Sequence, residues 1–143
     1  MHRVTRQARC RVRIATAVAT IALAVMSCDD STGISSINGP WTLRTVNGAP
    51  LPYPVAANGT TTAELLDDVI TLYVGGTWSQ SMRERTTTGG QVSTSTRTLA
   101  GSYSTFGTSI TLTASDGTKA RIATVQGDAM TIVEPGLTMV YRK

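Results

Sequence analysis

Glycine-containing turn dipeptides punctuate the chain from residue 41 to its end. They are NG at 47–48, GG at 75–76 and 89–90, DG at 116–117 and GD at 127–128. Glycine and asparagine tolerate the positive φ angles that tight hairpin turns need. The runs between these turns alternate apolar and polar residues and are rich in threonine, valine and isoleucine, as is typical of strands. The pattern predicts an all-β chain after residue 28, with little or no helix.

Eight strands are expected, at 41–46, 63–74, 77–86, 92–104, 109–115, 119–126, 129–134 and 139–143. Short turns join them in sequence, except for the proline-rich connection at 49–54, which cannot be a central strand because proline lacks an amide donor. Sequential antiparallel strands favour an eight-stranded up-and-down barrel, since closure removes exposed edges. A two-sheet β-sandwich is the alternative, although short hairpins leave little chain for Greek-key returns.

The first 27 residues have the pattern of a secretory signal. Residues 1–13 are basic without any acid, and residues 14–26 carry no charge. The apolar run is shorter than the roughly 20 residues that span a bilayer. We therefore predict a cleaved signal peptide at 1–27, with an N-terminal signal helix ahead of the barrel.

The sequence VMSC at 25–28 resembles the bacterial lipobox, in which the signal is cut before an acylated cysteine. Cys10 lies in the predicted signal, so Cys28 is otherwise a lone thiol in an oxidising compartment. Lipidation of Cys28, with palmitate among the acyl chains, is the prediction; ordinary secretion with an incidental cysteine is the alternative. The domains are then a lipoprotein signal at 1–27, a flexible tether at 28–39 and a barrel at 40–143.

The net charge of +4 comes from the predicted signal, which holds five of the thirteen basic residues. Without residues 1–27, eight basic residues face nine acidic ones, a net charge of −1. This leaves no basic footprint for nucleic acid. The expected partners are a membrane, through the anchor at Cys28, and a small apolar ligand or an envelope protein. The expected location is the bacterial cell envelope, facing the periplasm or the exterior.

Catalytic and metal-binding side chains are scarce. The only histidine is His2, so the chain after Cys28 has no residue for an imidazole metal site or a histidine-dependent nucleophile. Asp67 and Asp68 point to opposite faces of a strand, so the pair is poorly placed for two-carboxylate catalysis. We interpret them as solvated charges; a weak calcium site at the turn-proximal end of the pair is the alternative. We expect no enzymatic activity, no metal and no cofactor.

The segment RERTTTGGQVSTSTRT at 83–98 has Val92 as its one large apolar residue. The simpler interpretation is a long solvated hairpin arm. The alternative is a polar surface for a glycan or an envelope protein, with Arg83, Arg85 and Arg97 supplying its charge.

Three segments resemble the lipocalin-like lipoproteins of bacteria: GPWTLRTVNGAPLP at 39–52, DGTKARIATVQGDAMTI at 116–132 and VYRK at 140–143. Gly39, Pro40 and Trp41 look like the first lipocalin motif. The resemblance covers 39–143 and implies that Trp41 closes one end of the barrel, with Arg142 of the last strand packed over it. The chain is shorter than a full lipocalin and lacks a helix near its end, which argues against a large ligand cavity.

The expected interior is bulky, and an eight-stranded barrel is just wide enough to be filled by its own side chains. The expected interior residues are Leu43, Ile70, Leu72, Ile110, Leu112, Ile122, Met130 and Ile132. We therefore predict a lipid-anchored, non-enzymatic envelope domain with a filled barrel, serving a structural or interaction role. The alternative is a lipocalin-like binder of a small apolar ligand, which a cavity of about 300 Å³ or more would favour.

Overall fold

The computed structural model describes residues 37–143 as strands and turns. Within this range there is no helix long and apolar enough to cross a membrane. The predicted signal at 1–27, its helix, the lipidated Cys28 and the tether up to residue 36 lie outside the described residues.

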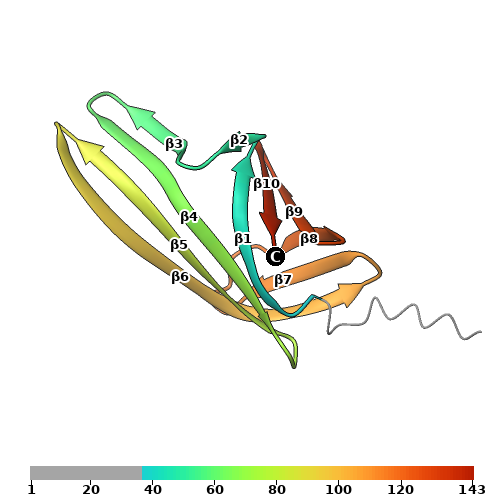
Figure 1. Cartoon of the computed structure of the whole chain (residues 1–143). Helices are drawn as coiled ribbons and strands as arrows, with labels where there is room; N and C mark the ends of the chain where they lie inside the picture. The colour runs from blue at the N-terminus through green and yellow to red at the C-terminus, as the bar shows by residue number, and fades with distance from the viewer. Residues whose placement is uncertain (1–36) are drawn as a thin grey trace, which may run out of the picture.

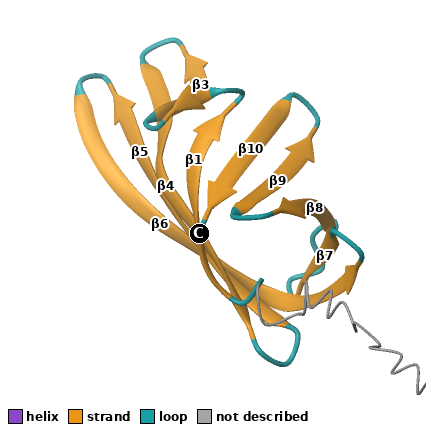
Figure 2. Ribbon diagram, turned by 45° about the vertical axis from the view of Figure 1, so that its right-hand side comes forward, coloured by secondary structure: helices purple, strands orange, loops and turns teal. Residues whose placement is uncertain are grey.

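Strands account for most of residues 37–143 (Figure 1). They are β1 (Gly39–Val46), β2 (Ala49–Pro50), β3 (Tyr53–Asn58), β4 (Thr61–Tyr73), β5 (Thr77–Thr88), β6 (Gln91–Phe106), β7 (Ser109–Ala114), β8 (Arg121–Gln126), β9 (Ala129–Glu134) and β10 (Leu137–Arg142). All but β2 and β3 form a ring in the order β1-β10-β9-β8-β7-β6-β5-β4, which closes because β4 pairs with β1 (Figure 2). The predicted eight-stranded antiparallel barrel is confirmed, and the sandwich is excluded.

The barrel is sealed more fully at one end than at the other. β1 pairs with β4 only through Gly39–Thr42. Beyond that point the two strands separate: the end of β1 pairs with β2, and the first half of β4 pairs with β3. We call the end that holds the start of β1 the closed end, and the opposite end, where β1 and β4 have separated, the mouth.

Three long strands continue past the mouth as an arm. β4, β5 and β6 have 13, 12 and 16 residues, whereas β7 to β10 have six each. With β3, their outer halves form a sheet whose tip is the turn at Gly89 and Gly90 (Figure 1). The β6 segment 91–98 is exposed, as predicted for a solvated hairpin, whereas residues 84–87 of the β5 half are only partly exposed. Among the described strands, only β5 pairs with residues 91–99.

Gly101 marks the place where β6 leaves the arm and enters the barrel. It pairs with Trp78 on one side and Ala114 on the other. A Cβ atom at this position would lie 1.9 Å from the carbonyl oxygen of Thr113. Glycine is required because it lets β6 and β7 approach this closely.

The NG turn at 47–48 behaves as its sequence predicts. Asn47 has φ of 51° and Gly48 has φ of 79°, which only such residues adopt at low cost. The Asn47 side chain also donates to the carbonyl of Gly136 at 3.0 Å and accepts from the amide of Thr138 at 2.8 Å. These bonds fasten the β1–β2 turn to the β9–β10 turn at the mouth.

The buried core fills the closed end and the middle of the barrel. Its largest members are Trp41, Trp78, Tyr141, Leu43, Ile70, Leu72, Ile110, Leu112, Met130 and Ile132. One predicted interior residue is wrong: Ile122 is 63% exposed, because β8 directs its neighbour Ala123 inward instead. A bulge between Leu65 and Asp67 likewise places Leu65, and not its neighbour Leu66, in the core.

Candidate ligand site at the barrel mouth

A cavity of about 660 Å³ occupies the mouth. Ligand pockets for small molecules commonly measure roughly 300–1,000 Å³. The arm forms one wall, and β7, β9, β10 and the segment 118–121 form the other. Much of the lining consists of large apolar side chains, namely those of Leu65, Met82, Leu99, Leu112, Leu137 and Met139. The mouth is therefore hollow where the closed end is packed.

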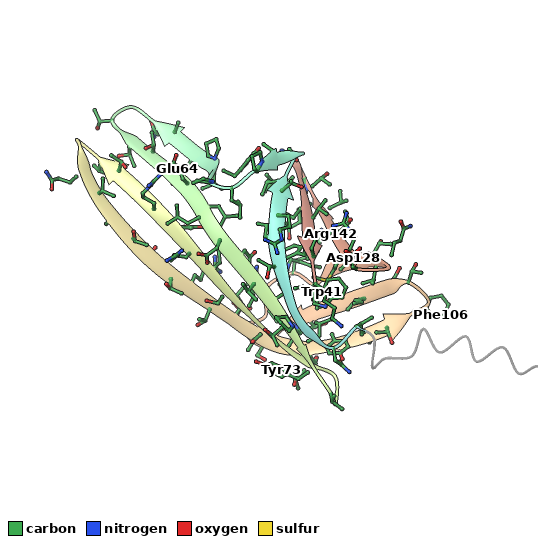
Figure 3. All side chains as sticks on the ribbon, viewed as in Figure 1. Trp41, Glu64, Tyr73, Phe106, Asp128 and Arg142 are labelled. Atoms are coloured by element: carbon green, nitrogen blue, oxygen red, sulfur yellow. The ribbon has the colours of Figure 1, made fainter. Side chains whose placement is uncertain are left out.

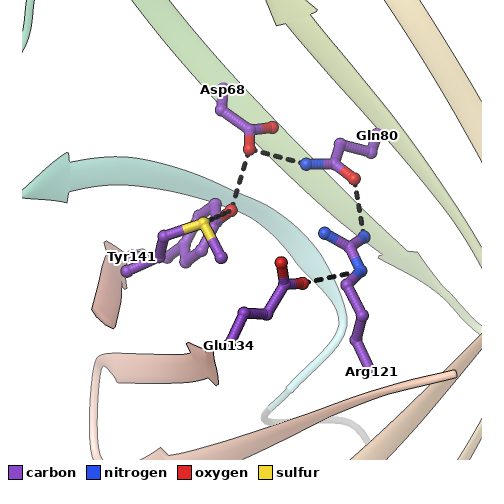
Figure 4. Close-up of polar contacts among 6 residues, drawn as sticks. Asp68, Gln80, Arg121, Glu134 and Tyr141 are labelled. Atoms are coloured by element: carbon purple, nitrogen blue, oxygen red, sulfur yellow. Dashed lines mark hydrogen bonds and ion pairs between the residues drawn. The ribbon is translucent and has the colours of Figure 1, made fainter. Parts of the chain in front are cut away.

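Asp68 reaches this cavity from the inner face of β4. Strand alternation places it in one row with Ile70 and Leu72, and its exposure is only 1%. Oδ2 accepts hydrogen bonds from Nε2 of Gln80 at 2.6 Å and from the hydroxyl of Tyr141 at 2.8 Å (Figure 4). Oδ1 is buried and has no hydrogen-bond partner among the described residues. Leaving a buried polar atom unpaired costs about 1–3 kcal/mol.

Burial sets the protonation behaviour of both acids in this group. It raises the pKa of the Asp68 carboxyl, and the hydrogen bonds from Tyr141 and Gln80 offset only part of that rise. Burial, together with the charge of Asp68, also raises the pKa of Tyr141 well above its ordinary value. Tyr141 consequently stays protonated and donates, while Asp68 retains its proton to a higher pH than a solvated aspartate does.

Arg121 completes the network from β8. Its Nη2 donates to Oε1 of Gln80 at 2.6 Å, and its Nε lies 4.0 Å from Oε1 of Glu134 (Figure 4). Its guanidinium carbon is 5.4 Å from the ring centroid of Trp78, within the range of a cation–π contact. Gln80 thus donates to an acid and accepts from a base, which fixes the orientation of its amide.

The charges that line the cavity balance. Asp68, Glu84 and Glu134 are acidic, and Arg97, Lys119 and Arg121 are basic. Net charge therefore does not select a ligand. The hydrogen-bonding state of each group is more informative, because Arg121 is engaged on several sides whereas one oxygen of Asp68 is not.

Trp41 lies at the closed end and is fully buried. Its Nε1 donates to the carbonyl of Ile37 at 2.8 Å. The residue over its ring is Lys143, whose Nζ lies 5.4 Å from the centroid. Arg142 instead donates from Nη1 to Asp128 at 2.6 Å (Figure 3).

The predicted pairing of Arg142 with Trp41 is therefore corrected to Lys143. The physical reason is strand alternation: Tyr141 faces inward, so Arg142 faces outward, and Lys143, just past the end of β10, lies on the side of the Trp41 ring. The last residues of the predicted tether also contact the barrel, because Asn38 accepts a hydrogen bond from the Tyr103 hydroxyl at 2.8 Å.

The arginines of the arm do not form one surface. Arg85 donates from both Nε and Nη2 to Glu64, at 2.8 and 2.6 Å, and Arg83 pairs with Asp67. Arg97 lines the cavity instead. As predicted, Asp67 and Asp68 face opposite ways, but the interpretation of Asp68 as a solvated charge is wrong.

Sequence reasoning missed the polar group of Asp68, Gln80, Arg121 and Tyr141. A signal was present, because each sits in the inward register of its strand. Gln80 follows Trp78 by two residues, and Arg121 precedes Ala123 by two. A charged or amide side chain in an inward row indicates either a buried network or a binding site.

No protein-family model matches the chain, and no curated protein matches it. Among solved structures, the chain is similar to the Cpx pathway activator NlpE from Escherichia coli, with 20% sequence identity and a TM-score of 0.44. The alignment covers 68% of this chain and 44% of that protein, so this chain spans less than half of its length.

Proposed function

We propose that this chain is a lipid-anchored, non-enzymatic domain of the bacterial cell envelope that binds a small amphipathic molecule in its barrel mouth. The observation that carries the proposal is the cavity of about 660 Å³, which combines an apolar lining with the buried polar group around Asp68. The core extends from the closed end as far as Leu65 and Met139, and beyond these two residues the mouth remains hollow. This supports the ligand-binding alternative over a barrel that is filled throughout.

The anchoring part of the proposal is supported by the sequence at 1–28: a basic segment, an uncharged apolar run and VMSC. The non-enzymatic part is supported by the lack of histidine after residue 2. Cys28→Ser should leave an uncleaved, slower-migrating precursor that takes up no radioactive palmitate. Palmitate labelling that persists in Cys28→Ser would remove the anchor from the proposal.

Ligand binding can be tested with prodan, an uncharged fluorophore whose emission shifts in apolar surroundings. The purified protein should bind it saturably. Leu99→Trp places a larger ring in the cavity lining and should weaken binding, because the added atoms occupy the space that a ligand needs.

Val92→Trp is the matched control, since Val92 is exposed on the arm and is not part of the lining. It should leave prodan binding unchanged. Absence of saturable binding by the wild type, or equal binding by Leu99→Trp and the wild type, would contradict the proposed function.

A further inference from the structure

We propose that the cavity selects amphipathic amines: a protonated nitrogen hydrogen-bonds Oδ1 of Asp68, and an apolar body lies along the wall of Leu65, Met82 and Leu99. This rests on the proposed function, that the mouth binds a small molecule, and it adds the chemical class of that molecule.

The unpaired oxygen of Asp68 is the first argument. Oδ2 already accepts two hydrogen bonds, from Gln80 and Tyr141, whereas Oδ1 accepts none in the described part of the chain. Asp68 is 1% exposed and lines the cavity, and Oδ1 itself has almost no accessible surface. A hydrogen-bond donor entering from the cavity satisfies this oxygen once the side chains that cover it move aside. A carboxylate or phosphate head would instead place a second acceptor against it.

The charges around Asp68 are the second argument. Its two hydrogen-bond donors, Gln80 and Tyr141, are neutral, and Gln80 stands between it and Arg121. Within residues 37–143, the carboxylate therefore has no cation in direct contact. A cationic head gains more at this position than a neutral donor does, because charge-assisted hydrogen bonds are about twice as strong as neutral ones.

The state of the basic residues is the third argument, since they could otherwise attract an anion. Arg121 is engaged by Gln80, Glu134 and the Trp78 ring. Lys119 and Arg97 are exposed, so an anion beside them would compete with water. The buried, incompletely bonded group in the cavity is thus an acid and not a base.

The test compares decylamine, decanol and decanoic acid as competitors of prodan at neutral pH. They share one apolar tail and differ in the head group. Decylamine should displace prodan at a concentration roughly tenfold lower than decanol, a ratio that corresponds to about 1.4 kcal/mol. Decanoic acid should be the weakest of the three. Equal displacement by all three, or strongest displacement by the acid, would overturn the amine assignment and leave the proposed function standing.

Asp68→Asn keeps the size of the side chain and removes its charge. It should abolish the preference for decylamine over decanol, because an amide at this position cannot form a charge-assisted hydrogen bond with the ammonium group. The matched control is Asp67→Asn, which removes the same charge one residue away on the outer face, where Asp67 pairs with Arg83. It should keep the preference. Loss of the preference in both variants would assign it to overall charge and contradict a contact at Asp68.

A pH series on the wild type gives a second readout that needs no variant. As the pH is lowered, the affinity for decylamine should begin to fall at a higher pH than that at which a solvated aspartate takes up a proton. The affinity for decanol should not show this fall. The other ionisable groups that face Asp68 or line its cavity are Tyr141, Arg121, Glu134, Glu84, Arg97 and Lys119, with Asp67 adjacent in sequence. The same series on Asp68→Asn isolates the part due to Asp68. A decylamine profile identical in the two proteins would contradict the proposal.

Discussion

The closed end and the mouth of this barrel are built by the same strands, but their interiors differ. At the closed end the inward side chains are large and apolar, as Trp41, Ile70 and Leu72 illustrate. At the mouth β4 contributes Asp68 and β5 contributes Gln80, and a cavity remains between them. Strand alternation decides which side chains face inward, whereas their size and polarity decide whether the space is filled. The first region stabilises the fold, and the second gives up stability for a hollow, polar interior.

The largest effect is expected from Trp41→Ala at the closed end. Removing a fully buried tryptophan should lower the free energy of unfolding by about 3–5 kcal/mol, through lost burial and the cavity left behind. Urea denaturation followed by circular dichroism measures this. Phe106→Ala is the control, because that ring is 91% exposed and should cost little. A loss below about 1 kcal/mol for Trp41→Ala would erase the contrast between the two ends.

Gly101→Ala tests the junction between barrel and arm. The added methyl group meets the backbone of Thr113, so β6 and β7 must separate. We expect a loss of about 1–3 kcal/mol in the free energy of unfolding, typical of overpacking. Ala100→Ser, at the exposed neighbouring position, is the control and should be nearly neutral. Equal denaturation midpoints for the two variants would show that the close approach of β6 and β7 is not needed.

Asp68→Asn should raise stability at neutral pH, the opposite sign to a closed-end variant. The raised pKa of Asp68 means that the folded protein holds this proton more tightly than the unfolded chain. Wild-type stability therefore declines as pH rises from the unfolded pKa, about 3.9, through the folded pKa. The variant does not ionise and escapes this loss, so its free energy of unfolding at neutral pH should exceed that of the wild type by an amount set by the difference between the folded and unfolded pKa.

Thermal melting from acid to neutral pH measures this gain, which should vanish below the unfolded pKa. Asp67→Asn, on the outer face, should show no such trend. A gain that stays constant over the whole pH range would not come from ionisation of Asp68.

The smallest effects are expected from the last two residues. Lys143→Ala removes the cation over Trp41 and should cost about 0.5–1 kcal/mol. Arg142→Ala removes a surface ion pair with Asp128 and should change the free energy of unfolding by less than about 0.5 kcal/mol. Chemical denaturation of both variants, alone and with Trp41→Ala, provides the comparison. The effects of Trp41→Ala and Lys143→Ala should be non-additive, because the two side chains touch. Non-additivity of Trp41→Ala with Arg142→Ala instead would show that Arg142 is the residue over the Trp41 ring.

Most of the fold could be predicted from local sequence. Turn dipeptides and the alternation of apolar and polar residues are both local features of the sequence, so they predict the eight barrel strands and their order. Strand β3 was not predicted, because Pro54 lies within it and the strand exists only as an edge beside β4. The bulge between Leu65 and Asp67 was also hidden, since it depends on how β4 meets β5.

The site was less accessible than the fold for a physical reason. Asp68 is separated from Gln80 by 12 residues and from Tyr141 by 73, so only the register of the closed barrel brings them together. The alternation within single strands could still have found part of it. Counting every second residue from Tyr141 leads to Lys143, not Arg142. A separate count along β4, back from Ile70, places the Asp68 carboxylate on the core face.

The one-sided pairing of β6 in the arm has a consequence for hydrogen exchange. Along an antiparallel strand, successive amides point alternately to its two neighbours. Residues 91–99 pair with β5 alone, Gly101 and Ser102 lie between β5 and β7, and residues 103–106 pair with β7. Alternate amides in 91–99 should therefore exchange with solvent deuterium within the time of local fluctuations, while the amides of Gly101 and Ser102, with a partner strand on each side, wait for the barrel to open. One continuous strand would then record two different opening free energies.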